Sequence, residues 1–295
     1  GDSNSAFGRS ALQNNSTASD NSAFGKDALK ANTTGSSNNS FGAESMTTNT
    51  TGNQNCAFGR QSLKTNNGNY NNAFGHQTLE LNTTGTQNQA FGLNALFANT
   101  TGGYNVAVGH AALTTQTTAN YNTAVGQEAG TNLTTGQYNT LIGNAAMKNA
   151  AVTGDYNIAI GNQSGYNNTS GYNNAYVGRN CAYSASTGHH NTAMGGSAAL
   201  YYLTTGNYNS AFGTDAGQNM TTGGNNTCLG HQAGFSITTG GYNVTVGNQA
   251  GYGQVSTGSN ELWIARSNTG ANNTATWIYG NSGGSCYQGN NQNVW

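Results

Sequence analysis

The chain has 295 residues and a formal net charge of −1, and only 6% of its residues are charged. Such a surface offers no basic patch to neutralise phosphates, which argues against nucleic acid as a partner. No stretch approaches the roughly 18 apolar residues of a membrane span, so no membrane insertion is expected. The opening GDSNSAFG does not read as a signal peptide, so we expect a processed fragment or a chain made without one.

Glycine recurs every 16 to 18 residues along the chain. From Gly8 to Gly247 there are 239 residues in 14 intervals, a mean period of about 17. A fixed period of this size is typical of a solenoid or fibre, in which each unit contacts only its neighbours. We therefore expect an all-β protein, a parallel β-solenoid or β-roll of about 15–17 coils. The anchor glycines are Gly8, Gly25, Gly42, Gly59, Gly75, Gly92, Gly109, Gly126, Gly143, Gly161, Gly178, Gly195, Gly213, Gly230 and Gly247.

Two columns of residues precede the anchors. Directly before each anchor stands a large apolar residue, and before that a small one, most often Ala. Adjacent strand residues point to opposite faces, so this pairing predicts a strand that is covered on both sides. We expect the large column to form the core inside each coil and the small column to face another copy of the chain. The large column is Phe7, Phe24, Phe41, Phe58, Phe74, Phe91, Val108, Val125, Ile142, Ile160, Val177, Met194, Phe212, Leu229 and Val246; the small column includes Ala6, Ala23, Ala57, Ala73, Ala90, Ala107, Ala124, Ala159, Ala193 and Ala211.

An asparagine stands four residues before every anchor. Identical amides stacked in register can form a hydrogen-bonded ladder along a solenoid, and Asn also bonds neighbouring main chain. We expect a structural ladder rather than a binding site. This asparagine column is Asn4, Asn21, Asn38, Asn55, Asn71, Asn88, Asn105, Asn122, Asn139, Asn157, Asn174, Asn191, Asn209, Asn226 and Asn243.

A second glycine lies seven residues before the anchor in 13 units, and in eight of them it ends a Thr-Thr-Gly sequence. Glycine at two fixed places per coil fits two corners that need positive φ or tight passage of the backbone. The pattern therefore predicts two short strands and two bends in each coil.

The repeats change character along the chain. Residues 1–115 are coils with Phe in the large column and Leu four positions after the anchor, whereas residues 116–255 often have Gly there. A tyrosine column emerges just before the asparagine column, comprising Tyr104, Tyr121, Tyr138, Tyr156, Tyr208 and Tyr242. In residues 256–295 the pattern decays, and the apolar alternation of ELWIA and ATWIY predicts strands of a degenerate β cap or connector.

The chain has few residues suited to chemistry. Its nine carboxylates and five histidines are spread over the whole length, with no grouped acid, base and nucleophile, so we expect no enzyme, no cofactor and no metal site. The pair His189 and His190 is expected on the solvated surface. Cys56, Cys181 and Cys228 are expected to be free and buried, since no zinc or haem spacing occurs, whereas the pattern gives no expectation for Cys286.

Surface functions remain open alternatives. Regularly spaced threonines are one way to order water, but here they are adjacent rather than in the T-x-T pattern of an ice-binding face. The N-x-T sequons, such as Asn32 and Asn132, follow from the composition. Exposed aromatic rings can stack on sugars, although they can also stack on one another between coils. Possible glycan contacts are Tyr104, Tyr121, Tyr138, Tyr156, Tyr208, Tyr242, Trp263 and Trp277.

The units NSAFGRSAL (4–12) and NTAVGQEAG (122–130) resemble the head repeats of YadA-type trimeric autotransporter adhesins. That resemblance covers residues 1 to about 255 and implies a left-handed parallel β-roll packed three around an axis. The longer unit and the end NELWIAR…ATWIYGN…CYQGNN look more like tail fibres of tailed phages, cyanophages among them. Neither family transfers a catalytic residue.

These patterns lead to an expected function. We expect a structural fibre protein, a homotrimer, that acts as a rigid spacer and host-attachment element of a phage tail fibre outside the cell. A host cell-surface glycan is the expected partner beyond the chain itself. A bacterial surface trimeric adhesin head is the first alternative, and an ice-binding β-solenoid is the second.

Overall fold

The computed structural model describes residues 1–149, 151–253, 257–265, 276–281, 283, 286–288 and 292–293. They belong to two compact units, Gly1–Thr153 and Gly154–Trp295. Both units are built from coils of about 17 residues that each add one strand to a parallel sheet, so the all-β solenoid of about 15 turns is confirmed. The expected change of coil type near residue 115 lies inside the first unit.

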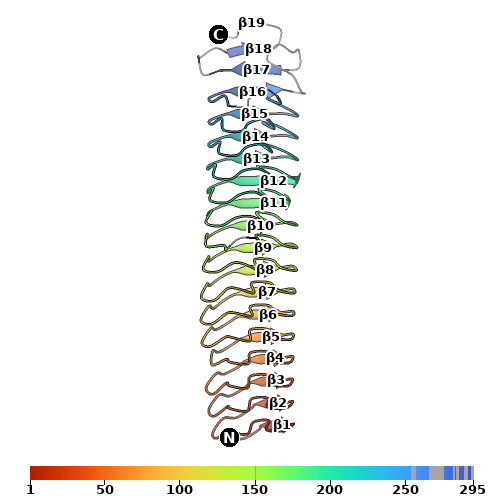
Figure 1. Cartoon of the computed structure of the whole chain (residues 1–295), viewed down its shortest axis with the longest axis vertical. Helices are drawn as coiled ribbons and strands as arrows, with labels where there is room; N and C mark the ends of the chain where they lie inside the picture. Colours follow the sequence, from red (N-terminus) through yellow and green to blue (C-terminus); the bar gives the residue numbers. More distant parts are fainter. Residues whose placement is uncertain are drawn as a thin grey trace. The chain divides into compact units, whose positions relative to one another are not determined.

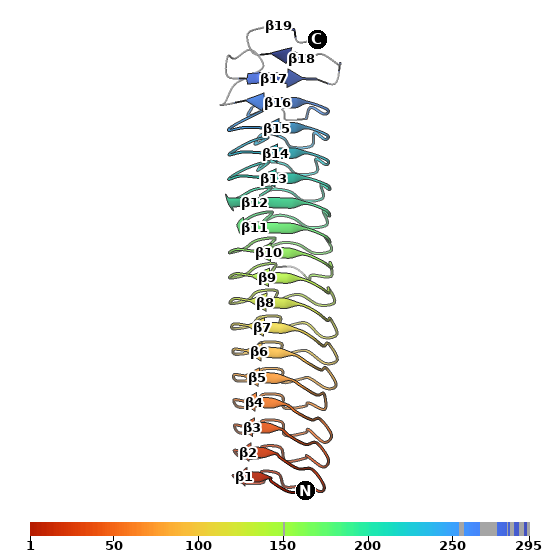
Figure 2. The same cartoon turned by 180° about the vertical axis from the view of Figure 1, so that it is seen from behind.

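The first unit contains nine short parallel strands, which Figures 1 and 2 show stacked in chain order. Successive strands pair in register, one coil apart, so that Ala6 lies opposite Ala23 and Phe7 opposite Phe24. Equivalent residues of each repeat therefore form straight columns. The strands are β1 (Ser5–Phe7), β2 (Ser22–Phe24), β3 (Asn39–Phe41), β4 (Cys56–Phe58), β5 (Asn72–Phe74), β6 (Gln89–Phe91), β7 (Val106–Val108), β8 (Thr123–Val125) and β9 (Thr140–Ile142).

The second unit continues the same repeat and then changes direction. Seven parallel strands are followed by three antiparallel ones, and the change occurs where β17 pairs with β16. A strand of opposite direction covers the sheet edge that another coil would otherwise occupy. The strands are β10 (Ile158–Ile160), β11 (Ala175–Arg179), β12 (Thr192–Ser197), β13 (Ser210–Phe212), β14 (Thr227–Leu229), β15 (Val244–Val246), β16 (Leu262–Ala265), β17 (Thr276–Gly280), β18 (Cys286–Gln288) and β19 (Gln292–Asn293).

The prediction of two strands per coil is wrong. Within the described coils each repeat has one strand, because left-handed residues interrupt the rest of the turn. In the second coil these are Asp27 (φ 58°) and Leu29 (φ 47°), and Ser37 follows with φ 59°. Such residues cannot belong to an extended strand. Neighbouring coils still exchange backbone hydrogen bonds there, such as Leu29 N to Ser45 O at 3.1 Å.

The expected inside and outside of the coil are reversed. The small column is buried within the coil, and the large column points outward, as the pattern of β4 shows, with Ala57 completely buried and Phe58 38% exposed. The interior is narrow because one short strand and its turns enclose it, and it is filled by small residues together with the Leu four positions after the anchor. Leu63 is one of these completely buried residues. A phenylalanine from every coil would not fit beside them.

The switch from Leu to Gly four positions after the anchor follows from packing inside the coil. A Cβ on Gly130 would lie 2.7 Å from Leu141 Cδ1 in the small column of the next coil. One on Gly234 would lie 2.5 Å from Cys228 Sγ of its own coil and 3.0 Å from Thr245 Oγ1 of the next. Glycine keeps the left-handed backbone conformation that Leu has at this position in other coils. Because it has no side chain, it leaves room for these neighbouring side chains. The pairs, in chain order, are Gly130 with Leu141, Gly165 with Tyr176, Gly217 with Cys228, and Gly234 with Thr245.

The two glycine columns serve different needs. The anchor glycines of most coils have φ between 116° and 140°, and a Cβ on Gly109 would lie 2.5 Å from Gly126 O. The second column, represented by Gly102, does not have positive φ, but a Cβ there would overlap Ala119 O of the next coil. Glycine is therefore required for its positive φ only at the anchor column. At both columns it is also required because the backbone of the next coil passes too close for a Cβ.

Candidate functional site

The asparagine column forms the expected ladder inside the coils. Asn21 donates its backbone N–H and a side-chain N–H to Asn4 Oδ1, at 3.0 and 3.2 Å, and its other side-chain hydrogen to Gly35 O at 2.9 Å. From Asn21 to Asn139 in the first unit, and from Asn157 to Asn243 in the second, these residues are buried. Each amide thus satisfies main-chain groups of neighbouring coils, and the column is structural, as expected.

A second buried ladder of asparagines was not expected. Asn32 Nδ2 donates to Asn15 Oδ1 and to Gly35 O, both at 2.9 Å. The ladder runs through Asn15, Asn32, Asn49, Asn66, Asn82 and Asn99. It gives way to Gln116, whose Oε1 accepts from Asn122 at 3.1 Å. In the sequence, asparagines such as Asn32 recur three residues before the second glycine, and this fixed position could have indicated the ladder. The same residues also form N-x-T sequons, to which the recurrence was attributed.

In each unit the outer face of the strands carries one large apolar column beside a mostly polar but uncharged one. It carries the large column and the residues three before each anchor, among which there is no charged residue from Ser5 to Val246. In the first unit the phenylalanine rings stack along the axis: Phe41 and Phe58 have centroids 4.5 Å apart and an interplanar angle of 3°. The exposed members in both units are Phe7, Phe24, Phe58, Phe91, Val108, Ile142, Met194, Phe212 and Leu229.

The tyrosine column lies on the surface, as expected. Tyr121 stacks between Tyr104 and Tyr138, with centroids 4.9 Å away on either side, so both of its ring faces are covered. Tyr156, Tyr208 and Tyr242 are also exposed, and Tyr242, at 64%, is the most exposed of the column. Stacking between coils therefore leaves Tyr121 only its edge and hydroxyl for a ligand.

Of the two tryptophans predicted as glycan contacts, only Trp263 has a described side chain. Trp263 is only 2% exposed, because it continues the small column at the last parallel strand and fills the coil interior; its Nε1 donates to Glu261 Oε2 at 2.9 Å. The expectation that Trp263 contacts a glycan is wrong for this reason. Trp277 belongs to β17, and its side chain lies outside the described residues, as does that of Cys286.

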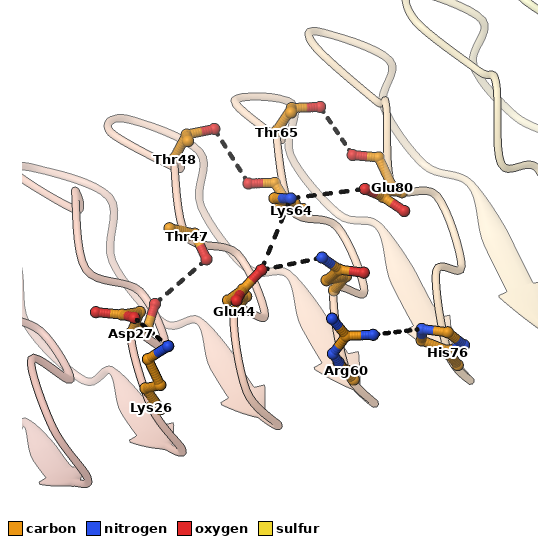
Figure 3. A network of polar contacts seen from close by, with 11 residues as sticks. Lys26, Asp27, Glu44, Thr47, Thr48, Arg60, Lys64, Thr65, His76 and Glu80 are labelled. Carbon is orange, nitrogen blue, oxygen red and sulfur yellow. Dashed lines mark hydrogen bonds and ion pairs between the residues drawn. The ribbon is translucent and has the colours of Figure 1, made fainter.

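Charged residues pair with one another on the outer turns of the first unit, as Figure 3 shows. Lys64 Nζ lies 3.7 Å from Glu44 Oε2 and 3.8 Å from Glu80 Oε1. Gln61 Nε2 donates to Glu44 Oε2 at 3.0 Å, and this hydrogen bond, followed by the charge of Lys64, lowers the pKa of Glu44. The network ties successive coils together.

In most of the threonine pairs only the second threonine is exposed to solvent, so these pairs form mainly one column of exposed threonines rather than two. The first threonine of a pair donates to the next coil, as Thr33 Oγ1 does to Thr50 O at 3.0 Å and Thr83 Oγ1 to Thr100 O at 2.9 Å. The second threonine, such as Thr51, is exposed. A wide flat face with two columns of free hydroxyls is therefore not formed by these pairs.

Cysteines and histidines are mostly scattered. Cys56, Cys181 and Cys228 are free; Cys181 and Cys228 are buried as expected, whereas Cys56 lies on the outer strand face and is only half-buried, contrary to expectation. Within the described ranges there is no set of three or more His, Cys, Asp or Glu side chains that could hold a metal ion. Nor does this part of the chain contain a helix long and apolar enough to cross a membrane.

No protein-family model, curated protein or solved structure matches the chain.

Proposed function

We propose that this chain is a structural fibre protein that assembles as a homotrimer through the outer face of its strands. In the assembly it would be a rigid spacer of a phage tail fibre and would carry the host-attachment surface outside the cell. The observation that carries the proposal is the outer strand face, which in the described coils presents a column of large apolar side chains beside an uncharged polar column.

An apolar surface that repeats in every coil needs a cover of matching extent. Exposed contiguous apolar patches of more than a few hundred Å² are rare on monomeric proteins and mark contact sites. Parallel strands recur about every 4.8 Å along a solenoid, so a partner can fill every groove between large side chains only if it has the same spacing. A second and third copy of this chain meet that condition, and a neutral face creates no repulsion between identical copies.

Host attachment is proposed for the exposed aromatic residues outside this face. An aromatic ring binds a sugar through its face, so the stacked Tyr121 is a poor candidate and the more exposed Tyr242 is a better one. A glycan array should therefore lose signal for Tyr242→Ser but keep it for Tyr121→Ser. Equal binding by both variants, or no binding by the parent chain, would remove the glycan from the proposal.

The assembly is tested by light scattering of the folded chain. A homotrimer has three times the chain mass of 30.3 kDa. Phe58→Lys places like charges on the proposed contact and should give folded monomers, while Thr51→Lys, on an exposed turn, should leave the trimer intact. A folded parent chain that scatters as a monomer would refute the proposal.

A further inference from the structure

Two adjacent histidines of the second unit, His189 half-buried and His190 exposed, bring the same ring atom together. His189 Nδ1 lies 2.9 Å from His190 Nδ1, and the two rings are nearly perpendicular, at 84°. Adjacent residues usually project away from each other, so this convergence is a specific local arrangement. We propose that His189 and His190 form a two-nitrogen binding site for a divalent transition-metal ion, with Cu²⁺ or Ni²⁺ as the ion that fits best.

Each ring is held by an aromatic neighbour from another coil. His189 stacks on Tyr172 with centroids 4.7 Å apart, and His190 stacks on Tyr208 at 5.0 Å. The backbone N–H of His189 also donates to Asn207 Oδ1 at 2.8 Å. Ligands whose rings are fixed before the ion arrives lose little conformational freedom on binding.

The spacing of the two nitrogens selects the type of ion. Metal–imidazole bonds are about 2.0–2.1 Å long, and two nitrogens 2.9 Å apart then subtend about 90° at the metal. That angle is the one between neighbouring ligands in square-planar or tetragonal coordination, which Cu²⁺ and Ni²⁺ adopt, and it is too narrow for the tetrahedral sites of Zn²⁺. Water would occupy the remaining positions, since His190 is exposed and His189 is only half-buried.

Binding of the ion moves one proton within His190 and changes the net charge of neither imidazole. Asn173 Nδ2 lies 3.3 Å from His190 Nε2 and donates to it, which assigns the proton of His190 to Nδ1, where it is shared with His189 Nδ1. The ion takes the place of that proton, which moves to His190 Nε2. The amide of Asn173 then turns so that its Oδ1 accepts from Nε2–H, the usual support for a metal-bound imidazole. Both rings stay neutral throughout.

Two other histidines provide internal controls. His231 is exposed and pairs through Nδ1 with Asn248 Oδ1 at 3.0 Å, and His76 lies 3.4 Å from Arg60. Neither has a second imidazole in contact. All residues of the proposed site belong to the second unit of one chain.

The test is a titration of the whole chain with CuCl₂ and NiCl₂ by calorimetry, with electron paramagnetic resonance of the Cu²⁺ complex. We expect one ion per chain, a spectrum of two equatorial imidazole nitrogens, and binding weakened at least about tenfold in His189→Phe and in His190→Phe. His231→Ala should bind as the parent does. The Phe variants retain the stacking on Tyr172 and Tyr208, and unchanged thermal midpoints would show that only the ligand was lost.

Three results would overturn the proposal. The first is a parent chain that binds neither ion stoichiometrically. The second is a Cu²⁺ spectrum without two imidazole nitrogens, and the third is equal weakening by His231→Ala and His189→Phe.

Discussion

Ala57 and Phe58 are neighbours in the chain, yet Ala57 is completely buried inside its coil while Phe58 lies 38% exposed on the outer strand face. The same relationship holds for Ala90 and Phe91 and for Ala211 and Phe212. The coils therefore have small residues in this column inside and large residues outside.

Enlarging an interior residue should be harmful unless space is made for it. Ala90→Leu should lower the free energy of unfolding by about 1–3 kcal/mol through overpacking, whereas Phe91→Leu on the outer face should cost less than about 1 kcal/mol. Leu79 occupies the place that Gly130 takes before Leu141, so adding Leu79→Gly should restore part of the loss. Thermal unfolding of the three variants checks the order, and a double variant no better than Ala90→Leu would contradict the packing explanation.

Removing one rung of the asparagine column should destabilise far more than removing a surface asparagine. Asn122 donates to Gly136 O at 2.9 Å and accepts from Asn139 N at 2.9 Å, so Asn122→Ala leaves buried groups unpaired and should cost about 2–4 kcal/mol. Asn144 is exposed and makes a weak contact with Gln127 O at 3.4 Å, so Asn144→Ala should stay within about 0.5 kcal/mol. Equal shifts in thermal midpoint for Asn122→Ala and Asn144→Ala would contradict a stabilising role of the asparagine column.

Substitution by alanine should strongly destabilise the chain at an anchor glycine and should have little effect at a glycine without positive φ or a close backbone contact. Gly109 has φ 132°, and a Cβ would lie 2.5 Å from Gly126 O, so Gly109→Ala should cost more than about 3 kcal/mol. Gly196 lacks positive φ, and a Cβ would meet only Thr214 Oγ1 at 3.4 Å, so Gly196→Ala should be neutral or stabilise by up to about 1 kcal/mol. Urea unfolding of both variants provides the measurement.

The interior cysteines should resist thiol reagents across the neutral range. Burial raises the pKa of Cys228 to about 11 and raises that of Cys181, so both thiols stay protonated at pH 8 as well as shielded. In a Cys286→Ser variant, iodoacetamide followed by mass spectrometry should modify these two residues only after denaturation. Modification of Cys228 at the same rate in the native and the denatured chain would show that it is not in the interior.

The period of the sequence was sufficient to predict the coils, their parallel pairing and the first ladder, because every coil repeats one environment and Asn21, Asn38 and their equivalents never vary. It was not sufficient to orient the strand. An alternation of Ala and Phe is compatible with either residue inside, and the width of the interior decides between them. That width depends on Leu29 and Asp27 adopting left-handed backbone, which bulky and charged residues rarely do.

The surfaces were predicted less completely for a similar reason. Tyr104 and its equivalents lie outside, as the sequence predicts. The residue type of Trp263 suggests an exposed ring, but its register opposite Thr245 places it in the interior. The pair His189 and His190 resembles ordinary polar surface in the sequence. In the structure Tyr172 and Tyr208 from other coils stack on the two rings, whose Nδ1 atoms lie 2.9 Å apart.

Cross-linking through Cys56 tests the central claim most directly. Cys56 lies on the outer strand face two residues before Phe58, so a homotrimer packed through that face brings the Cys56 thiols of different copies together. In the Cys286→Ser chain, a short bismaleimide should yield covalent dimers at low protein concentration. The Cys56→Ser, Thr51→Cys control, with its thiol on an exposed turn, should yield none. Absence of dimers through Cys56, or equal dimers through both positions, would contradict assembly by this face.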